Sequence, residues 1–241
     1  MRRRPPGRDW MRPIADRLTP TVKTIIIAQV CIYLFYVFVR QSRGLVESHL
    51  AIGPGLFAGE LWQPLTSLFV HIDFLGWVLD ILGLWFVGAV VERAHGARRS
   101  FAIFLIAGVL ANITLAGAWR LRGAWAMPFD DGAQFAVMAM FVSWARLHGR
   151  THAQLLLTGF TLQARYLVLI VIGWMVAANI TRGNWPAILA LAVACVVGYL
   201  GAGPVNLKEA WQLYKARRLR SQYRVLDGGR KPNKPKKKYL N

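Results

Sequence analysis

The feature of this 241-residue sequence that most constrains its fold is the gathering of apolar residues into long blocks. Six stretches are nearly free of charge: residues 24–39, 65–91, 101–118, 133–145, 166–181 and 185–202. Several approach the roughly 20 residues that an α-helix needs to cross the hydrocarbon core of a bilayer. Hydrophobic residues make up 55% of the chain, too many for a soluble domain that must keep a charged shell. The pattern predicts an all-α integral membrane protein with six transmembrane helices.

The basic residues predict how these helices are oriented, because Lys and Arg near span ends are retained on the cytoplasmic side. Of the 30 Lys and Arg residues, 25 lie in four segments that alternate with the remaining loops: residues 1–23, 92–100, 146–165 and 208–241. Both termini are therefore expected in the cytoplasm, which requires an even number of spans. We expect a basic arm (1–19), a six-span membrane domain (20–203) and a basic tail (204–241), located in the inner membrane of a bacterial cell.

The net charge of +19 does not by itself indicate a nucleic-acid-binding protein. A basic excess on cytoplasmic flanks is favoured both by topology and by anionic lipid, so anionic lipid is the expected partner of that leaflet. The tail is expected to begin with an amphipathic helix and to end in a disordered Lys-rich segment. Cys31 and Cys195 lie inside apolar blocks, which predicts no disulfide, metal or cofactor.

Polar residues and glycines recur at specific spacings from residue 60 to residue 96. They are Glu60, Trp62, Thr66, Phe69, His71, Gly88, Glu92 and Gly96. This stretch resembles the rhomboid family, in which Glu-x-Trp-Arg, Thr, Phe, His and a closing Gly-x-x-x-Glu run from the first outer loop through the second span. The resemblance implies a six-helix rhomboid-like bundle over about residues 20–202, with loop positions such as His71 acting as polar caps or interfacial anchors.

The resemblance also implies where catalytic groups would stand. Active rhomboids use a Ser at the start of the fourth span, a His base in the sixth, and a His and an Asn on the second that stabilise the oxyanion. The corresponding positions here are Gln134 for the nucleophile, Cys195 for the base, and Gly76 and Asp80 for the oxyanion groups. No His follows His152, and Phe135 is expected to obstruct a site where backbone must approach substrate. These substitutions predict that the chain is not an enzyme.

Asp80 is the residue with the sharpest functional alternative, since a carboxylate within a span is costly and usually functional. Its structural interpretation is a protonated side chain that donates to a backbone carbonyl, with Gln134 as a conceivable neighbour. In the last span, Ala190, Ala194, Gly198 and Ala202 repeat every four residues. Such a stripe lets helices approach closely in lipid and predicts packing within the chain rather than dimerisation.

The sequence therefore predicts a rhomboid-like pseudoprotease, a membrane scaffold that binds transmembrane segments of client proteins without cleaving them. Three alternatives stay open. One is an active intramembrane peptidase with non-standard catalytic residues, and another is a tether that recruits a partner through the basic tail. The last is a small channel or transporter that uses Asp80, for which the further polar residues in the spans are Gln29, Asn112, Gln134 and Asn179.

Overall fold

A computed structural model describes residues 18–39, 41–122, 132–149, 152–154 and 161–203 of the chain. The described residues up to Ala202 form one compact unit. The amphipathic helix and Lys-rich end expected in the tail, and most of the basic arm, lie outside the described residues.

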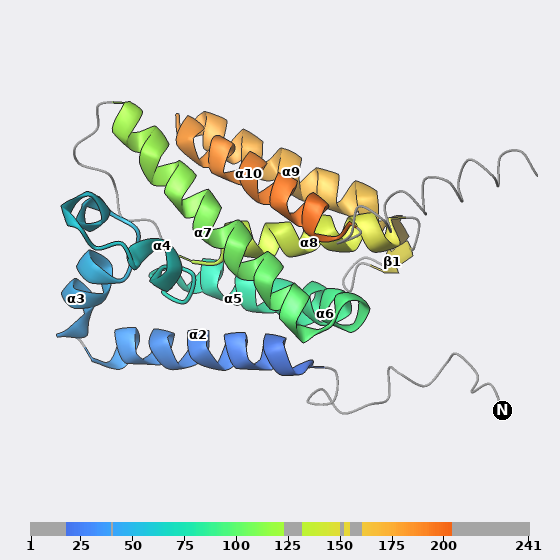
Figure 1. The fold of residues 1–241 in the computed structure, drawn as a ribbon, viewed down its shortest axis with the longest axis horizontal. Helices are drawn as coiled ribbons and strands as arrows, with labels where there is room; N and C mark the ends of the chain where they lie inside the picture. The colour runs from blue at the N-terminus through green and yellow to red at the C-terminus, as the bar shows by residue number, and fades with distance from the viewer. Residues whose placement is uncertain (1–17, 40, 123–131, 150–151, 155–160, 204–241) are drawn as a thin grey trace, which may run out of the picture. The chain divides into compact units, whose positions relative to one another are not determined.

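The described residues are mostly helical (Figure 1). The longer helices are α2 (Pro20–Phe38), α5 (Phe74–Gly83) continued by η3 (Leu84–Gly88) and α6 (Ala89–His95), α7 (Ala97–Leu121), α8 (Gln134–His148), α9 (Ala164–Thr181) and α10 (Trp185–Gly201). Four helical stretches in this part of the chain are long and apolar enough to cross a membrane: α2, α5 to α6, α7 and α9. α10 is apolar but shorter. The prediction of a helical, multi-pass membrane protein is thus confirmed in its coarse form.

Short elements fill the loops. The segment after α2 contains α3 (Ser42–His49), η2 (Pro54–Ala58) and α4 (Gln63–Thr66), where only a loop was expected. Strands β1 (His152–Gln154) and β2 (Thr161–Gln163) pair antiparallel between α8 and α9, so the described chain is not purely helical.

The second span begins at Phe74, not at residue 65 as hydropathy predicted. Asp73 is its N-cap and accepts a 2.6 Å hydrogen bond from the Gly76 amide, which satisfies one of the free N–H groups of the first turn. Farther along, η3 is a π-helical segment within the span, a feature that often occurs near functional sites. Hydropathy cannot detect either feature, because both depend on backbone geometry.

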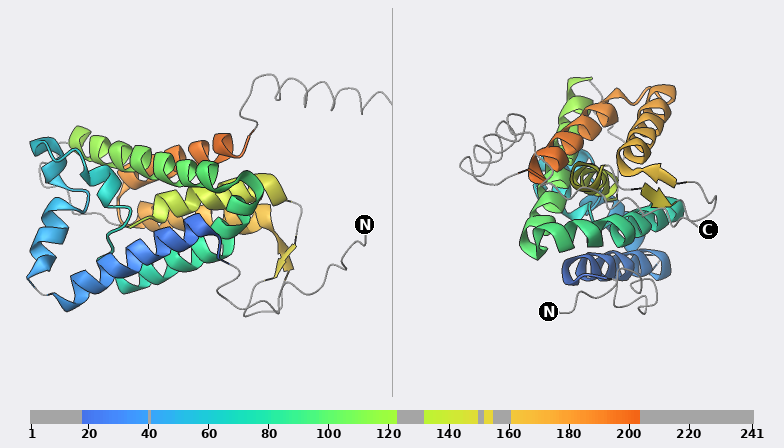
Figure 2. Two further views of the ribbon diagram at one scale, coloured as in Figure 1. Left: turned by 60° about the horizontal axis from the view of Figure 1, so that its bottom comes forward. Right: turned by 90° about the vertical axis from the view of Figure 1, so that its right-hand side faces the viewer.

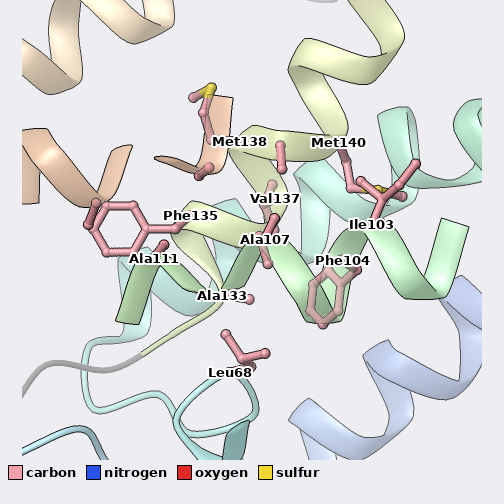
Figure 3. Packing of buried hydrophobic residues seen from close by; sticks show 14 of the residues in the cluster. Leu68, Ile103, Phe104, Ala107, Ala111, Ala133, Phe135, Val137, Met138 and Met140 are labelled. Carbon is pink, nitrogen blue, oxygen red and sulfur yellow. The ribbon is translucent and has the colours of Figure 1, made fainter. Parts of the chain in front are cut away.

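Helix α8 is the centre of the arrangement. It packs against α7, α10, α9 and α5, and the end-on view in Figure 2 shows these helices around it. The main core forms along its buried face, where Phe135, Met138 and Met140 are each at most 4% exposed. Figure 3 shows these large side chains interleaved with the small Ala107, Ala111 and Ala133. Alternating large and small residues give the density that helix packing in lipid requires.

Helices α8 and α10 approach each other most closely at Gly198. A Cβ built on this glycine would lie 2.3 Å from the carbonyl oxygen of Ala139, and the hydroxyl of Ser143 donates a 2.7 Å hydrogen bond to the Gly198 carbonyl. Ala194 and Ala190, one and two turns earlier on the same face, are fully buried. The small-residue face of α10 is therefore turned inward.

One end of the helices is tied together by polar contacts. The carboxylate of Glu92 in α6 accepts from the Thr19 hydroxyl (2.5 Å) and from the amides of Thr21 and Val22 (3.0 and 3.1 Å), and so caps the beginning of α2. Arg99 donates to the carbonyl of Gly201 at the end of α10. The start of α2, the α6–α7 junction and the end of α10 therefore lie at the same end of the described structure (Figure 1).

Replacing Gly198 with Ala tests the close approach. We expect Gly198→Ala to lower the free energy of unfolding in detergent by about 1–3 kcal/mol, because the added Cβ collides with the backbone of α8. Gly173→Ala in α9 is the matched control, since nothing lies within 4 Å of its Cβ position. That change should be neutral or stabilising by up to about 1 kcal/mol through helix propensity. Equal thermal stability of the two variants would contradict the close approach of α8 and α10 at Gly198.

Candidate functional site

The segment from residue 64 to residue 71 is the foundation of the site. It comprises most of the short helix α4 and the turns that follow it, and two of its carbonyl groups accept hydrogen bonds from side chains of neighbouring helices. Gln29 of α2 donates to the Leu68 carbonyl at 3.1 Å, and Asn112 of α7 donates to the Pro64 carbonyl at 3.2 Å. Asn112 also donates to the Ser67 hydroxyl at 2.8 Å. Non-helical backbone at membrane depth is tolerated where protein groups satisfy it in this way.

These bonds bear on the channel alternative, because they occupy polar side chains that a conduction path would have needed. Gln29 and Asn112 bind the 64–68 backbone, and Asn179 donates to the Met175 carbonyl of its own helix at 2.8 Å. These three polar residues, which a conduction path would have needed, instead form hydrogen bonds within the protein.

A second network holds the preceding loop. Glu60 binds the ring of His49 at 2.6 Å, and Trp62 donates its indole N–H to the His49 carbonyl at 2.8 Å. Gln63, which is fully buried, accepts from the Gly53 amide and donates to Glu60. Gln63 was not predicted as a site residue, although it occupies the motif position at which the family has Arg.

The central feature of the site is a buried contact between His71 and Asp80. Nε2 of His71 lies 3.1 Å from Oδ2 of Asp80, and the two residues are 2% and 7% exposed. The same Oδ2 accepts a 2.8 Å hydrogen bond from the amide of Ala133, immediately before α8. The contact thus joins the 64–71 segment, α5 and the start of α8.

This geometry corrects two predictions. His71 is buried, whereas its match to a loop position suggested a cap or interfacial anchor. Asp80 was expected to donate to a backbone carbonyl or to lie against Gln134, but it accepts from a backbone amide and contacts His71. The error has a simple origin, since hydropathy places a residue in a span and does not show which loop folds back against it.

The chemistry of the pair follows from the donors around it. With Asp80 ionised, Oδ2 accepts from both Ala133 and His71, so Nε2 of His71 carries the proton in the 3.1 Å contact. Nδ1 of His71 is then buried without a hydrogen-bond partner among the described residues. Gly132, at φ +89°, packs against the pair, and a Cβ there would lie 3.3–3.4 Å from the imidazole and from Oδ2. The site therefore offers acceptor atoms in an apolar setting.

The other positions implied by the family motif lie on separate helices. Gly76 is in the first turn of α5, Gln134 is the first residue of α8, and Cys195 lies in α10, partly buried against the core. Phe135 does not obstruct the site as expected, because its ring is 3% exposed and belongs to the core beside Ala111 (Figure 3). Its side chain points into the bundle, a direction that only helix packing decides.

The remaining motif residues have roles in packing. Phe69 contacts Phe104, with ring centroids 6.4 Å apart, and the hydroxyl of Thr66 donates to the Leu50 carbonyl at 2.8 Å. Gly88 allows α2 to approach, since a Cβ there would lie 3.0 Å from Val22. Gly96 has φ +82° between α6 and α7, a conformation that favours glycine.

Apolar helices packed through small residues, with a loop folded back against a polar pair inside the bundle, define a helical multi-pass membrane protein. The model of the Rhomboid domain matches residues 58–204, more than half of the chain, and the protein therefore belongs to the rhomboid family. The family predicted from residues 60–96 is confirmed.

Curated relatives carry the name rhomboid protease GlpG. The protein from Salmonella choleraesuis (strain SC-B67) is 20% identical over 195 residues, which cover 79% of this chain and 66% of the relative. The protein from Salmonella paratyphi A (strain ATCC 9150 / SARB42) is 22% identical over 169 residues, covering 70% and 56% of the two chains. The match spans less than two thirds of the length of these relatives.

These relatives overturn one prediction. Substitutions at Gly76, Asp80, Gln134 and Cys195 led to the expectation that the chain is not an enzyme, whereas the relatives are named proteases and point to a peptidase. The expectation rested on a few positions matched to the catalytic pattern of the family, and the absence of one set of catalytic groups does not determine whether a different set exists.

The His71–Asp80–Ala133 contact can be tested by stability. Asp80→Leu leaves two buried donors without an acceptor, so we expect it to lower the free energy of unfolding by about 1–3 kcal/mol for each. Asp80→Asn should cost less, because its amide oxygen still accepts from Ala133. Asp73→Asn is the control, since Asn also caps a helix. Thermal unfolding in detergent measures all three, and an Asp80→Leu protein as stable as the parent would contradict the contact.

Proposed function

We propose that this protein binds transmembrane helices of client membrane proteins along the exposed apolar face of α5, the helix whose inner face bears Asp80. Such binding is common to a rhomboid-type peptidase and to a client-binding scaffold of the same fold. The observation that carries the proposal is the His71–Asp80 pair, which is buried on the inner face of an apolar span whose opposite face is exposed and apolar. Leu75 and Leu79, on the same helix, are 63% and 58% exposed.

We further propose a six-span arrangement in the inner membrane with both termini in the cytoplasm. The start of α2, the α6–α7 junction and the end of α10 share one end of the structure, and Arg93, Arg98 and Arg99 lie at that junction. Basic residues at one end support its placement on the cytoplasmic side. Asp80 then lies toward the opposite, outer end, because it is six residues from the start of α5, or about 9 Å.

Photocrosslinking tests the binding proposal. A photoreactive residue at Leu79 should capture a co-expressed single-span client, whereas the same residue at Ile106 of α7 should capture much less. The two positions are matched, with 58% and 52% exposure on different helices. Equal capture at both positions, or none at either, would count against a client site on α5.

A second candidate function is peptide-bond hydrolysis by non-standard groups, which the names of the relatives favour. The structure offers one specific basis for it, because an imidazole held by a carboxyl group is an arrangement suited to a general base. Nδ1 of His71 would accept a proton from a water molecule as the water oxygen attacks the scissile carbonyl carbon, and would return that proton to the amide nitrogen as the C–N bond breaks.

Cleavage of a generic transmembrane substrate in proteoliposomes tests this second function. We expect His71→Ala to lower the rate by at least about 10²-fold, the usual contribution of a general base. Cys195→Ala and Gln134→Ala should retain activity if His71 acts on water. Loss of cleavage in Cys195→Ala instead would make the thiol the nucleophile, and absence of cleavage by the parent protein would reject the second function.

A further inference from the structure

Two exposed arginines stand where the end of α8 meets the start of α9. Arg146 lies in the last turn of α8, and Arg165 is the second residue of α9. A Cβ built on Gly149, the residue that follows α8, would lie 3.7 Å from the Cβ of Arg165, so the two helix ends are in contact. Both helices also pack against α10 (Figure 1). The two guanidinium groups are therefore carried by adjoining ends of membrane helices.

Each guanidinium group is held against a tyrosine. The Cζ atom of Arg146 lies 4.0 Å from the ring centre of Tyr199 in α10, and the same guanidinium group donates to the Tyr199 carbonyl. The Cζ atom of Arg165 lies 4.6 Å from the ring centre of Tyr166, and its guanidinium group donates to the Tyr166 hydroxyl at 3.1 Å. A guanidinium group carries several N–H donors, and the described residues accept one hydrogen bond from each group. The tyrosines thus position both groups and leave donors available for a ligand.

The helices around these arginines carry no carboxyl group. The sequence contains no Asp or Glu from residue 132 to residue 208, a stretch that includes all of α8, α9 and α10. On α6, which also packs against α8, the carboxylate of Glu92 is used by the amides of Thr21 and Val22 at the start of α2. Two fixed cationic groups without an acidic neighbour on their own helices favour an anionic ligand.

The surface one turn deeper in the span is apolar. Leu169 and Ile170 follow Arg165 by about one turn of α9 and are 61% and 60% exposed. Val196, about one turn from Tyr199 in α10, is 56% exposed. Residues three or four apart on a helix share a face, so exposed apolar side chains lie below each arginine–tyrosine pair. An anionic head and apolar tails would match this combination of surfaces.

We propose that the adjoining ends of α8, α9 and α10 form a binding site for an anionic phospholipid, whose phosphate group binds the guanidinium groups of Arg146 and Arg165. Its acyl chains lie along the exposed apolar side chains of α9 and α10. A lipid fits better than a free phosphate ion, because lipid headgroups lie at the ends of membrane helices and a free ion would not use the apolar surface. Arg99, at the α6–α7 junction, binds the Gly201 carbonyl of α10, so the site lies at the end proposed above to face the cytoplasm. The inference is independent of client binding at α5.

Titration of the full-length protein with lipid measures this site. The protein in dodecyl maltoside micelles is titrated with phosphatidylglycerol or with phosphatidylcholine, and bound lipid is counted by native mass spectrometry. The parent should bind phosphatidylglycerol more tightly than phosphatidylcholine. A basic residue near an anionic surface contributes about 1 kcal/mol, so Arg165→Gln and Arg146→Gln should each weaken the tightest phosphatidylglycerol binding about fivefold. Arg165→Gln should fold as the parent does, because its partner is the neighbouring Tyr166 and no contact between helices is lost.

The matched control removes the same charge from the same end of the protein. Arg93 and Arg98 are exposed at the α6–α7 junction, and the double variant Arg93→Gln/Arg98→Gln should change phosphatidylglycerol binding much less than Arg146→Gln/Arg165→Gln does. An equal loss in the two double variants would show that the lipid responds to net charge alone, and the inference would be overturned.

Competitors distinguish a lipid from other anionic ligands. Inorganic phosphate and an acidic peptide, each at the concentration of the lipid, should leave phosphatidylglycerol bound. Displacement by either competitor, or equal binding of phosphatidylglycerol and phosphatidylcholine by the parent, would reject an anionic phospholipid site.

Discussion

Close contact between small residues is the constraint on which this structure depends. In a bilayer the lipid tails are as apolar as a leucine side chain, so helices gain little by burying apolar surface against each other. They associate when their backbones can approach closely, as α10 approaches α8 where Gly198 faces Ala139. Gly83 plays a similar part between α5 and α8, since a Cβ there would lie 2.6 Å from Val137. The position of α8, and hence of the site at its start, follows from these approaches.

The second requirement is that every polar group within the membrane find a partner in the protein. Gln29 and Asn112 meet it by binding carbonyl groups of the 64–68 segment. The same segment leads into His71, which is thereby brought against Asp80. Polar residues scattered along three helices and a loop thus fold one piece of irregular chain into the bundle, and the functional site is a consequence of that folding.

Family membership and site geometry support different parts of the functional argument. The rhomboid family establishes a membrane protein whose relatives are named proteases. The particular residues at the site distinguish this chain, because a carboxyl group and an imidazole are paired where α5 meets the start of α8. The two proposed functions, client binding and hydrolysis, both depend on this part of the structure.

Much of this could be predicted from the sequence, because it depends on local or periodic properties. Apolar blocks identify membrane helices, since only helices satisfy their own backbone in lipid, and the motif from Glu60 to Gly96 identified the family. Asp80 was predicted to be a functional candidate because placing a carboxyl group inside a membrane span costs free energy.

Other features were decided only by the tertiary structure, because they join residues far apart in the chain. The partner of Asp80 proved to be His71 and the Ala133 amide rather than Gln134, which depends on how a loop folds back. Phe135 points into the core rather than across the site, and the second span begins at an Asp73 cap that hydropathy does not register. Sequence alone thus determined that the chain is a multi-pass membrane protein and to which family it belongs, whereas packing in three dimensions decided which residues meet.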